Sequence, residues 1–421
     1  MADLAGWLPW LFVAALACFA LGWVAARIDV KQLIHESRAM PRAYFRGLNF
    51  LMNEEPDKAV EAFIDVSKAH PEAVELQFAL GSLLRRRGEA DRAIKIHQEL
   101  MERSGLDSVL RQSAALELAR DFQRAGLLDH AEDVLEALVP KLTKDNPLRR
   151  EALMLLKDIS VQAREWNRAI EATQSFMTEF AGGDTRLKAE LAQFHCERAE
   201  ELKATDITAA TRELDAALAV NPACVRANIL RGDWQAAAGK HDDAIAAWLA
   251  IEQQDTACMG LVAARLMQSW RAMGHVDRGI AELTRLQAEM PGLEIMKVLL
   301  AATRDAAGQT AALELARDQL RRHPTLVGLD RVFETQTGLA NCEDSAELAL
   351  QKKVVHDHSE KLAMYLCTEC GFKARQHFWH CPACGNWESM PPRLTAELET
   401  AGRHLFHAKA AASFPQTSTR S

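Results

Sequence analysis

Residues 78–97 read FALGSLLRRRGEADRAIKIH, and this stretch decides the fold because its pattern recurs along the chain. Gly47 and Ala59 recur 34 positions later as Gly81 and Ala93, which is the spacing of a helix–turn–helix unit. Small residues at these positions allow the two helices of a unit to pack closely, and a glycine between the helices permits the turn. Because one helix pair cannot bury its apolar face alone, we expect successive pairs to stack around one continuous core.

Further copies of the pattern continue towards the C-terminus. Residues 118–135 and residues 231–248 carry alanine or glycine in the same roles, the latter reading RGDWQAAAGKHDDAIAAW. Two intervening copies, near residues 166 and 210, lack the turn glycine, so their boundaries stay open. Over residues 43–324 the pattern, in about eight units, resembles the tetratricopeptide repeat family. That resemblance implies an all-α superhelix whose concave face holds peptide segments or partner domains.

The N-terminus contains a long apolar run. Residues 7–26 read WLPWLFVAALACFALGWVAA, and no charged residue occurs between Leu4 and Ala26. At about 1.5 Å per helical residue, this run matches the roughly 30 Å hydrocarbon layer of a bilayer. A cleaved signal peptide is the alternative, but such peptides normally begin with a cationic leader, whereas Asp3 is the only charged side chain before the run. Basic residues predominate just after it, which predicts a single-pass anchor with the rest of the chain in the cytoplasm.

Two short cysteine motifs lie near the C-terminus, CTECG at residues 367–371 and CPACG at residues 381–385. In each motif the two-residue gap lets both sulfurs point the same way, and the glycine permits a sharp reversal. Four thiolates complete a tetrahedral shell around one metal ion, which predicts a structural or redox-active metal rather than a hydrolytic centre. The predicted metal ligands are Cys367, Cys370, Cys381 and Cys384.

The segment around these motifs is too short to build a hydrophobic core, so metal binding is expected to supply most of its folding free energy. A thioredoxin-type redox pair is the alternative, but that motif occurs singly and on a βαβ unit, which this sequence lacks. His377 and His380 are possible substitute ligands, although with four cysteines available we interpret them as exposed loop residues. The aromatic side chains expected to cover the sulfurs are Tyr365, Phe372, Trp379 and Trp387.

The remaining cysteines occur singly within helical patterns, and we interpret them as small core residues. Free thiols suit a reducing compartment, in agreement with a cytoplasmic location. These residues are Cys18, Cys196, Cys224, Cys258 and Cys342.

Charge and motif content favour a binding protein over an enzyme. A formal net charge of −8 argues against a broad nucleic-acid-binding surface. The sequence contains no Gly-rich phosphate loop, H-E-x-x-H or G-x-S-x-G motif, and we predict no catalytic residue. His356 and His358 are two positions apart and do not share a helix face, which indicates a solvated linker. Residues 85–87, three arginines, close a first helix, where cations suit the helix C-terminus; a phosphate or lipid headgroup contact is the alternative.

The order of anchor, repeat array and four-cysteine module resembles the lipopolysaccharide assembly protein B family of Gram-negative bacteria, whose C-terminal element is rubredoxin-like. The resemblance implies an inner-membrane adaptor that helps an FtsH-type membrane protease degrade the deacetylase of the committed step of lipid A synthesis. It also implies a contact with an inner-membrane regulator of the YejM/PbgA type. The residues that carry the resemblance most specifically are Cys367, Cys370, Gly371, Cys381, Pro382, Cys384 and Gly385.

The resemblance favours iron in the module, with zinc as the alternative. Only ten residues separate Cys370 from Cys381, fewer than between the cysteine pairs of rubredoxins, so the module is closer in size to a zinc ribbon. Both metals accept four thiolates in tetrahedral geometry, so the ligands alone do not decide.

Two other classes of function remain as alternatives. A membrane-tethered, rubredoxin-like electron-transfer protein would use a four-thiolate iron as a one-electron carrier. A zinc-ribbon nucleic-acid binder would use Lys373, Arg375 and the aromatic residues around them, although the acidic chain and its anchor argue against nucleic acid as a partner.

These features predict six consecutive parts of the chain. The connector at residues 325–363 is expected to be helical, to carry an apolar stripe and to dock the metal module onto the last repeats. The stripe consists of Ala346, Leu348, Leu350 and Val354. The parts are a transmembrane anchor (1–27), a cytoplasmic juxtamembrane linker (28–42), the repeat array (43–324), the connector (325–363), the rubredoxin-like module (364–390), and a C-terminal helix and disordered tail (391–421).

Overall fold

The computed structural model describes residues 46–392, except residues 48, 51, 54, 70–72, 181–182, 338–344 and 360–363. The predicted anchor, the juxtamembrane linker and nearly all of the predicted C-terminal part lie outside the described residues. Among the helices that the structure describes, none is both long enough and apolar enough to cross a membrane. The chain divides into two compact units, Met1–Glu165 and Trp166–Ser421.

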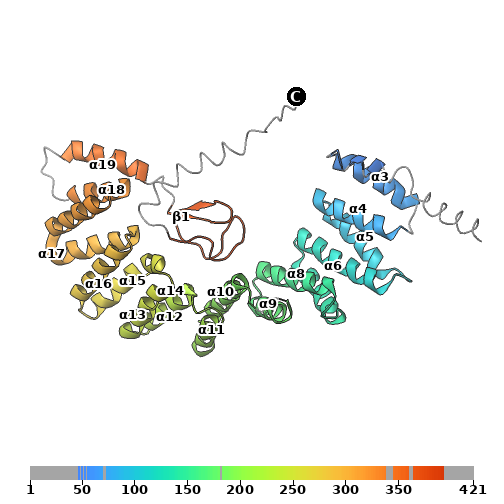
Figure 1. Ribbon diagram of the computed structural model, residues 1–421, viewed down its shortest axis with the longest axis horizontal. Coiled ribbons are helices and arrows are strands. Elements are labelled where there is room, and N and C mark those ends of the chain that lie inside the picture. The colour runs from blue at the N-terminus through green and yellow to red at the C-terminus, as the bar shows by residue number, and fades with distance from the viewer. Residues whose placement is uncertain are drawn as a thin grey trace, which may run out of the picture. The chain divides into compact units, whose positions relative to one another are not determined.

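The first unit consists of helices that pack as successive antiparallel hairpins (Figure 1). Helix α4 packs on α5, and α6 packs on α7. Their buried side chains, among them Leu84, Leu100, Leu118 and Leu135, form the core of the unit. The helices are α3 (Pro56–Ala69), α4 (Val74–Arg87), α5 (Ala90–Glu102), α6 (Ser108–Ala125), α7 (Leu128–Leu138), the 3-10 helix η1 (Val139–Lys141) and α8 (Pro147–Ala163).

The second unit continues the hairpins and ends in the cysteine module. Helix α10 packs on α11, α12 on α13, and α15 on α16. The helices are α9 (Trp166–Phe180), α10 (Thr185–Leu202), α11 (Ile207–Val220), α12 (Val225–Ala237), α13 (His241–Leu249), α14 (Ile251–Gln254), the 3-10 helix η2 (Thr256–Leu261), α15 (Ala263–Ala272), α16 (Val276–Glu289), α17 (Leu293–Arg322), α18 (Leu326–Gln336) and α19 (Ser345–Ser359).

A glycine on the first helix of a hairpin faces a large side chain on the second helix, and this contact sets how closely the two helices approach. A Cβ atom added at the glycine would lie within 2.7 Å of that side chain in every one of three repeats. These distances confirm that a small residue at each of these positions allows the two helices to pack closely. The pairs are Gly47 with Phe63, Gly81 with His97, and Gly232 with Trp248.

Two turns show how the repeat pattern tolerates departures. The copy near residue 166 lacks a turn glycine, and there Arg164 takes the left-handed backbone conformation instead, with φ at 60°. Its backbone N–H donates to the last carbonyls of α8, so the helix ends in the usual way. Gly308 has φ at 88° inside α17 and divides it into two helices.

The connector differs from its prediction. It is helical as α18 and α19, but Leu350 and Val354 are 63% and 53% exposed, so the predicted apolar stripe on α19 is wrong. Polar contacts hold α19 instead: the ring of His356 and the hydroxyl of Ser359 both lie within 3.2 Å of the carboxylate of Asp330 on α18. His356 is therefore part of a helix–helix contact rather than of a solvated linker.

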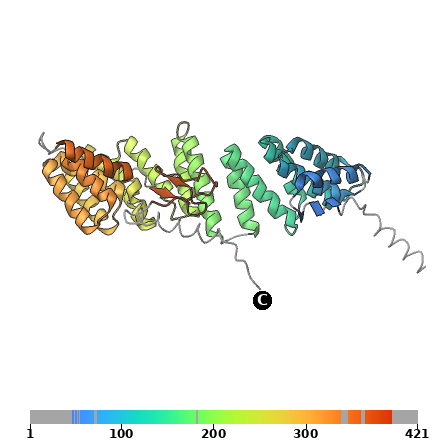
Figure 2. The same ribbon diagram turned by 90° about the horizontal axis from the view of Figure 1, so that it is seen from above.

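Little regular structure forms in the cysteine module. Strand β1 (Tyr365–Leu366) pairs antiparallel with β2 (Lys373–Ala374), with Tyr365 opposite Ala374. Its small core contains Tyr365, Cys367, Cys381 and Met390, each at most 6% exposed. Figure 1 and Figure 2 both show this module beside the middle helices of the second unit.

Replacing Gly232 by Ala should destabilise the second unit. The new Cβ atom would lie 2.3 Å from Nε1 of Trp248, a buried side chain that cannot move freely. Overpacking should outweigh the gain in helix propensity, for a net loss of about 1–2 kcal/mol in urea denaturation followed by circular dichroism. Gly183→Ala is the matched control, because apart from its chain neighbours no atom of the described residues lies within 4 Å of its added Cβ. Equal stabilities of the two variants would contradict this account of the glycine.

Candidate metal centre

The two cysteine motifs fold into nearly identical knuckles. In each, the N–H of the first cysteine donates to a carbonyl five residues later, and the N–H of the glycine donates back to the carbonyl of that cysteine. Gly371 and Gly385 have φ angles of 74° and 70°, a conformation that favours glycine. The bonds are Cys367 N to Phe372 O (2.9 Å), Gly371 N to Cys367 O (3.0 Å), Cys381 N to Asn386 O (2.9 Å) and Gly385 N to Cys381 O (2.9 Å).

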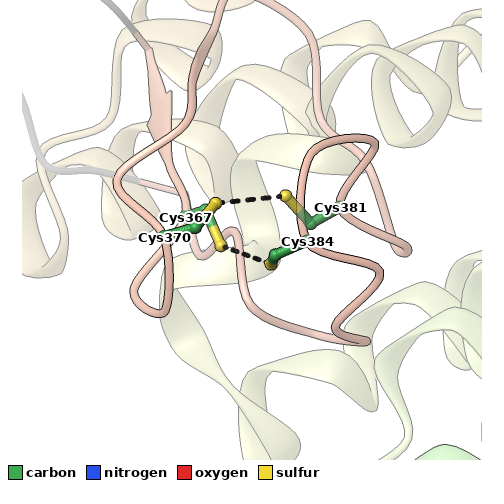
Figure 3. A group of neighbouring side chains, drawn as sticks. All are labelled: Cys367, Cys370, Cys381 and Cys384. Carbon is green, nitrogen blue, oxygen red and sulfur yellow. Dashed lines mark hydrogen bonds between the residues drawn. The ribbon is translucent and has the colours of Figure 1, made fainter. Parts of the chain in front are cut away.

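The knuckles bring all four predicted ligands together, with every pair of Sγ atoms within 4.8 Å (Figure 3). Sγ of Cys367 lies 3.7 Å from Sγ of Cys384, and Sγ of Cys370 lies 3.8 Å from Sγ of Cys381. A tetrahedron with metal–sulfur bonds of about 2.3 Å has sulfur–sulfur edges of about 3.8 Å. The donor set and its spacing therefore fit a single tetrahedral metal ion, while the binding itself stays a prediction.

Polar groups favour the thiolate form at two of the four cysteines, Cys367 and Cys384. Burial opposes ionisation of Cys367, but the hydroxyl of Ser389 and the backbone N–H groups of Cys370 and Glu369 lower its pKa to about 6. The amide Nδ2 of Asn386 donates to Sγ of Cys384 over 3.3 Å. Such surrounding donors orient ligands and hold them ready for a metal.

Tyr365 packs with Cys367 and Cys381 and His380 is exposed, as expected, but His377, Phe372 and Trp387 do not lie where the sequence placed them. Among the described residues, the group with metal-ligand spacing consists of the four cysteines and includes neither His377 nor His380. His377 packs between Tyr365 and Trp379, and burial lowers its pKa to about 4. His377 is therefore not the exposed loop residue that we expected, and it is not a ligand.

Trp387 joins the module to the repeats instead of covering the sulfurs. Its ring packs edge-on against Phe194 of α10 at 5.7 Å and against Trp166 of α9 at 6.3 Å between ring centroids. Trp379 packs on the core of the repeats, and Leu261 contacts both that core and the core of the module. Phe372, which was also expected to cover the sulfurs, is 36% exposed.

Hydrogen bonds between residues that lie far apart in the sequence reinforce the contact between the module and the repeats. Nε2 of Gln193 donates to Oε1 of Glu388 over 2.6 Å, and a guanidinium N–H of Arg186 donates to Oδ1 of Asn386. Desolvation raises the pKa of Glu388, and the amide of Gln193 acts in the opposite direction. The partners lie 195 and 200 positions apart, so no local pattern in the sequence could have indicated them.

The module therefore also docks on helices that lie earlier in the chain than the last repeats, where it was predicted to dock. Met364 does contact Leu293 and Val327, at the beginnings of α17 and α18. Trp379 packs on the core that α12, α13, α15 and α16 form, and Trp387 and Glu388 reach back to α9 and α10.

Two core cysteines of the repeats are also closer than expected. Cys196 and Cys224 are buried, as predicted, but they do not stand singly, because their Sγ atoms lie 3.8 Å apart. A hydrogen bond with Cys224 and burial raise the pKa of Cys196, whereas the hydrogen bond with Cys196 lowers the pKa of Cys224. Cys258 is a buried core residue, as expected.

Stacked helical hairpins with a four-thiol knuckle module define a class: tetratricopeptide-repeat proteins that carry a rubredoxin-type metal module. Residues 46–104 and 200–257 match the tetratricopeptide repeat family, and residues 365–392 match the family described as rubredoxin metal binding domain. Among solved structures, a tetratricopeptide repeat protein from Parabacteroides merdae aligns over 62% of this chain and 97% of its own, with 15% identity and a TM-score of 0.32.

Curated relatives extend the similarity over nearly the whole chain. Lipopolysaccharide assembly protein B of Escherichia coli K12 is 30% identical over 385 residues, which cover 91% of this chain and 97% of the relative. The protein of the same name from Haemophilus influenzae is 28% identical over 396 residues, with the same coverage. The chain belongs to the lipopolysaccharide assembly protein B family.

The double variant Cys367→Ser/Cys370→Ser should lose its metal. We expect about one metal ion per chain in the unaltered protein and none in the variant, measured by plasma mass spectrometry, because two ligands cannot hold a tetrahedral site. Visible absorption of the unaltered protein would identify iron, and its absence with bound zinc would identify zinc. Ser389→Ala keeps all four ligands and should retain the metal with about tenfold lower affinity. Full metal content in the double variant would show that the four thiols are not the site.

Replacing Trp387 by Ala should undock the module while leaving the metal in place. The loss of aromatic packing on Phe194 should cost about 2–3 kcal/mol of docking free energy. Hydrogen exchange in α10 should accelerate, with metal content unchanged. Phe372→Ala is the control, because it removes an aromatic ring of the same module that is 36% exposed. Unchanged exchange in the Trp387 variant would contradict the docking role of this side chain.

Proposed function

We propose that this protein is an adaptor in lipopolysaccharide assembly, acting by holding other polypeptides rather than by converting a small molecule. The observation that carries the proposal is the alignment over 91% of the chain, repeats and metal module included, with relatives named lipopolysaccharide assembly protein B. Tetratricopeptide arrays commonly present extended surfaces for binding other chains.

The chemistry of the metal module supports a non-catalytic role. Four thiolates fill a tetrahedral shell, so the metal offers no open position to a substrate. The module also lies against α9 and α10, so a loaded metal stabilises the surface of the repeats. In this proposal the metal, iron or zinc, sets the shape of the second unit.

At the finer level, we propose that the adaptor promotes proteolysis of the lipid A committed-step deacetylase by an FtsH-type membrane protease. The apolar run at residues 7–26 supports a single-pass inner-membrane anchor with the repeats in the cytoplasm. Confining the array to the membrane raises its effective concentration beside such a protease, so weak contacts suffice. A YejM/PbgA-type regulator would then act through the same membrane region.

A second candidate is electron transfer, and one observation favours it. Cys370 and Cys384 are exposed, so an iron in the module would be within reach of a docking redox partner. Reversible reduction of the purified iron form, together with loss of a redox activity in a deletion strain, would favour this function over the adaptor.

The adaptor proposal predicts a change in protein turnover. In cells that depend on this chain, the Cys367→Ser/Cys370→Ser variant should lengthen the half-life of the deacetylase, because the undocked module no longer supports the repeats. A pulse-chase measurement with immunodetection would follow the half-life, and Phe372→Ala would serve as the control. Normal turnover in cells that lack the protein altogether would refute the role in proteolysis.

A further inference from the structure

A groove in the first unit is lined by arginines. It has a volume of about 740 Å³ and opens between α4, α6 and α8. No acidic side chain is among the described residues that line it. We call it the arginine groove, and its lining consists of Arg85, Arg86, Arg120, Gln123, Arg124, Leu155 and Gln162.

Carboxylates beneath the groove hold two of its guanidinium groups in place. Arg85 donates to Oδ1 of Asp121 over 2.7 Å and to Oε2 of Glu117 over 2.6 Å. Asp121 is fully buried, and the side chain of Glu117 is 18% exposed. Desolvation opposes ionisation of Glu117, but the hydrogen bond and charge of Arg85 lower its pKa. Arg120 pairs with Glu117 and with the more exposed Glu151, so two of the four arginines have carboxylate partners within the chain.

The other two arginines carry uncompensated charge. Arg86 and Arg124 lie in the last turns of α4 and α6, and both are exposed. Neither has an ion-pair partner among the residues that the structure describes. The favourable field of a helix C-terminus explains one cation at each end. It does not explain four guanidinium groups that converge on one groove.

A departure from the repeat pattern fixes Arg85 in this groove. His97 occupies the position that Phe63 and Trp248 hold in other repeats, and it is fully buried. Its Nδ1 lies 2.5 Å from Oδ2 of Asp121, the carboxylate that also binds Arg85. Its Nε2 has no hydrogen-bond partner among the described residues.

Stability alone does not account for this buried network. An aromatic side chain fills the same position in the first repeat, and apolar replacements of buried ion pairs are commonly neutral or stabilising. What the network produces is a guanidinium group of fixed orientation at the groove surface. Nη1 and Nη2 of Arg85 already donate to Asp121 and Glu117, so carboxylates of a partner are left to the other arginines of the groove.

We propose that the arginine groove binds an acidic segment of a partner polypeptide, with aspartate or glutamate side chains on Arg86 and Arg124. The inference rests on the proposed adaptor function and names the chemistry of one of its partners. Gln123 and Gln162 supply both donors and acceptors for a peptide backbone, and Leu155 supplies an apolar contact. A lipid headgroup would use the cations but has no backbone for these amides, so the lining favours a peptide.

Peptide binding to the full-length protein in nanodiscs of zwitterionic lipid tests the proposal. The probes are a fluorescent synthetic peptide rich in Asp, Glu and Leu, and its Asn/Gln counterpart. The acidic peptide should bind with an affinity that falls as salt is added, and the neutral one should not bind. Arg86→Ala/Arg124→Ala should weaken binding about tenfold, as expected for the loss of two exposed charge contacts.

Arg87→Ala is the matched control. Arg87 belongs to the same last turn of α4 but pairs with Asp57 and Glu89 and does not line the groove. Its affinity for the peptide should stay within about twofold of the unaltered protein. Equal binding by the double variant, or no binding of the acidic peptide to the unaltered protein, would overturn the proposal. So would binding of anionic phosphatidylglycerol vesicles through Arg86 and Arg124 without binding of the peptide.

The two proposals fail in distinguishable ways. Peptide affinity in vitro tests the proposal for the arginine groove, and circular dichroism checks that each variant is folded. The adaptor function stands or falls on the deacetylase half-life in cells. Deacetylase turnover that stays normal in a deletion strain would refute the adaptor function. If the purified protein still binds the acidic peptide, the proposal for the arginine groove would stand.

Discussion

Close approach of two helices within each hairpin is the constraint on which the rest of the structure depends. A glycine such as Gly232 leaves room for one large side chain, Trp248, and that side chain fills the space completely. Interiors packed to this density transmit small changes, because neighbouring side chains cannot absorb them. The spacing between the two helices of a hairpin follows from this one contact.

Different residues at the same position then give the repeats different chemistry. Phe63 and Trp248 make the contact with the glycine apolar. At the same position His97 makes a hydrogen bond with the carboxylate of Asp121, which also accepts from Arg85. In the second unit the metal module covers part of the repeats through Trp387. In the first unit, no residue that the structure describes covers the arginine groove. One scaffold thus supports a surface used within the chain and a surface suited to a partner.

Local patterns in the sequence were enough to predict the repeat fold and the meeting of four cysteines. Both depend on short-range spacing: 34 residues for a hairpin, and two knuckles of five residues each around the thiols. The docking of the module was missed because Glu388 and Gln193 are 195 positions apart. The stripe on α19 was wrong because apolar periodicity cannot show that a polar contact, His356 with Asp330, holds a helix. Metal identity is not decided by ligands that both iron and zinc accept.

The position of the module at the end of the chain has a consequence for biosynthesis. Phe194 is fully buried in the finished protein, and Trp387 forms part of its cover. During translation, α10 leaves the ribosome long before Trp387 is made. The ring of Phe194 is therefore exposed in the nascent chain until Trp387 has been added. A chain cut short before the knuckles displays that apolar surface to chaperones and proteases. Only a chain elongated past Trp387 hides it.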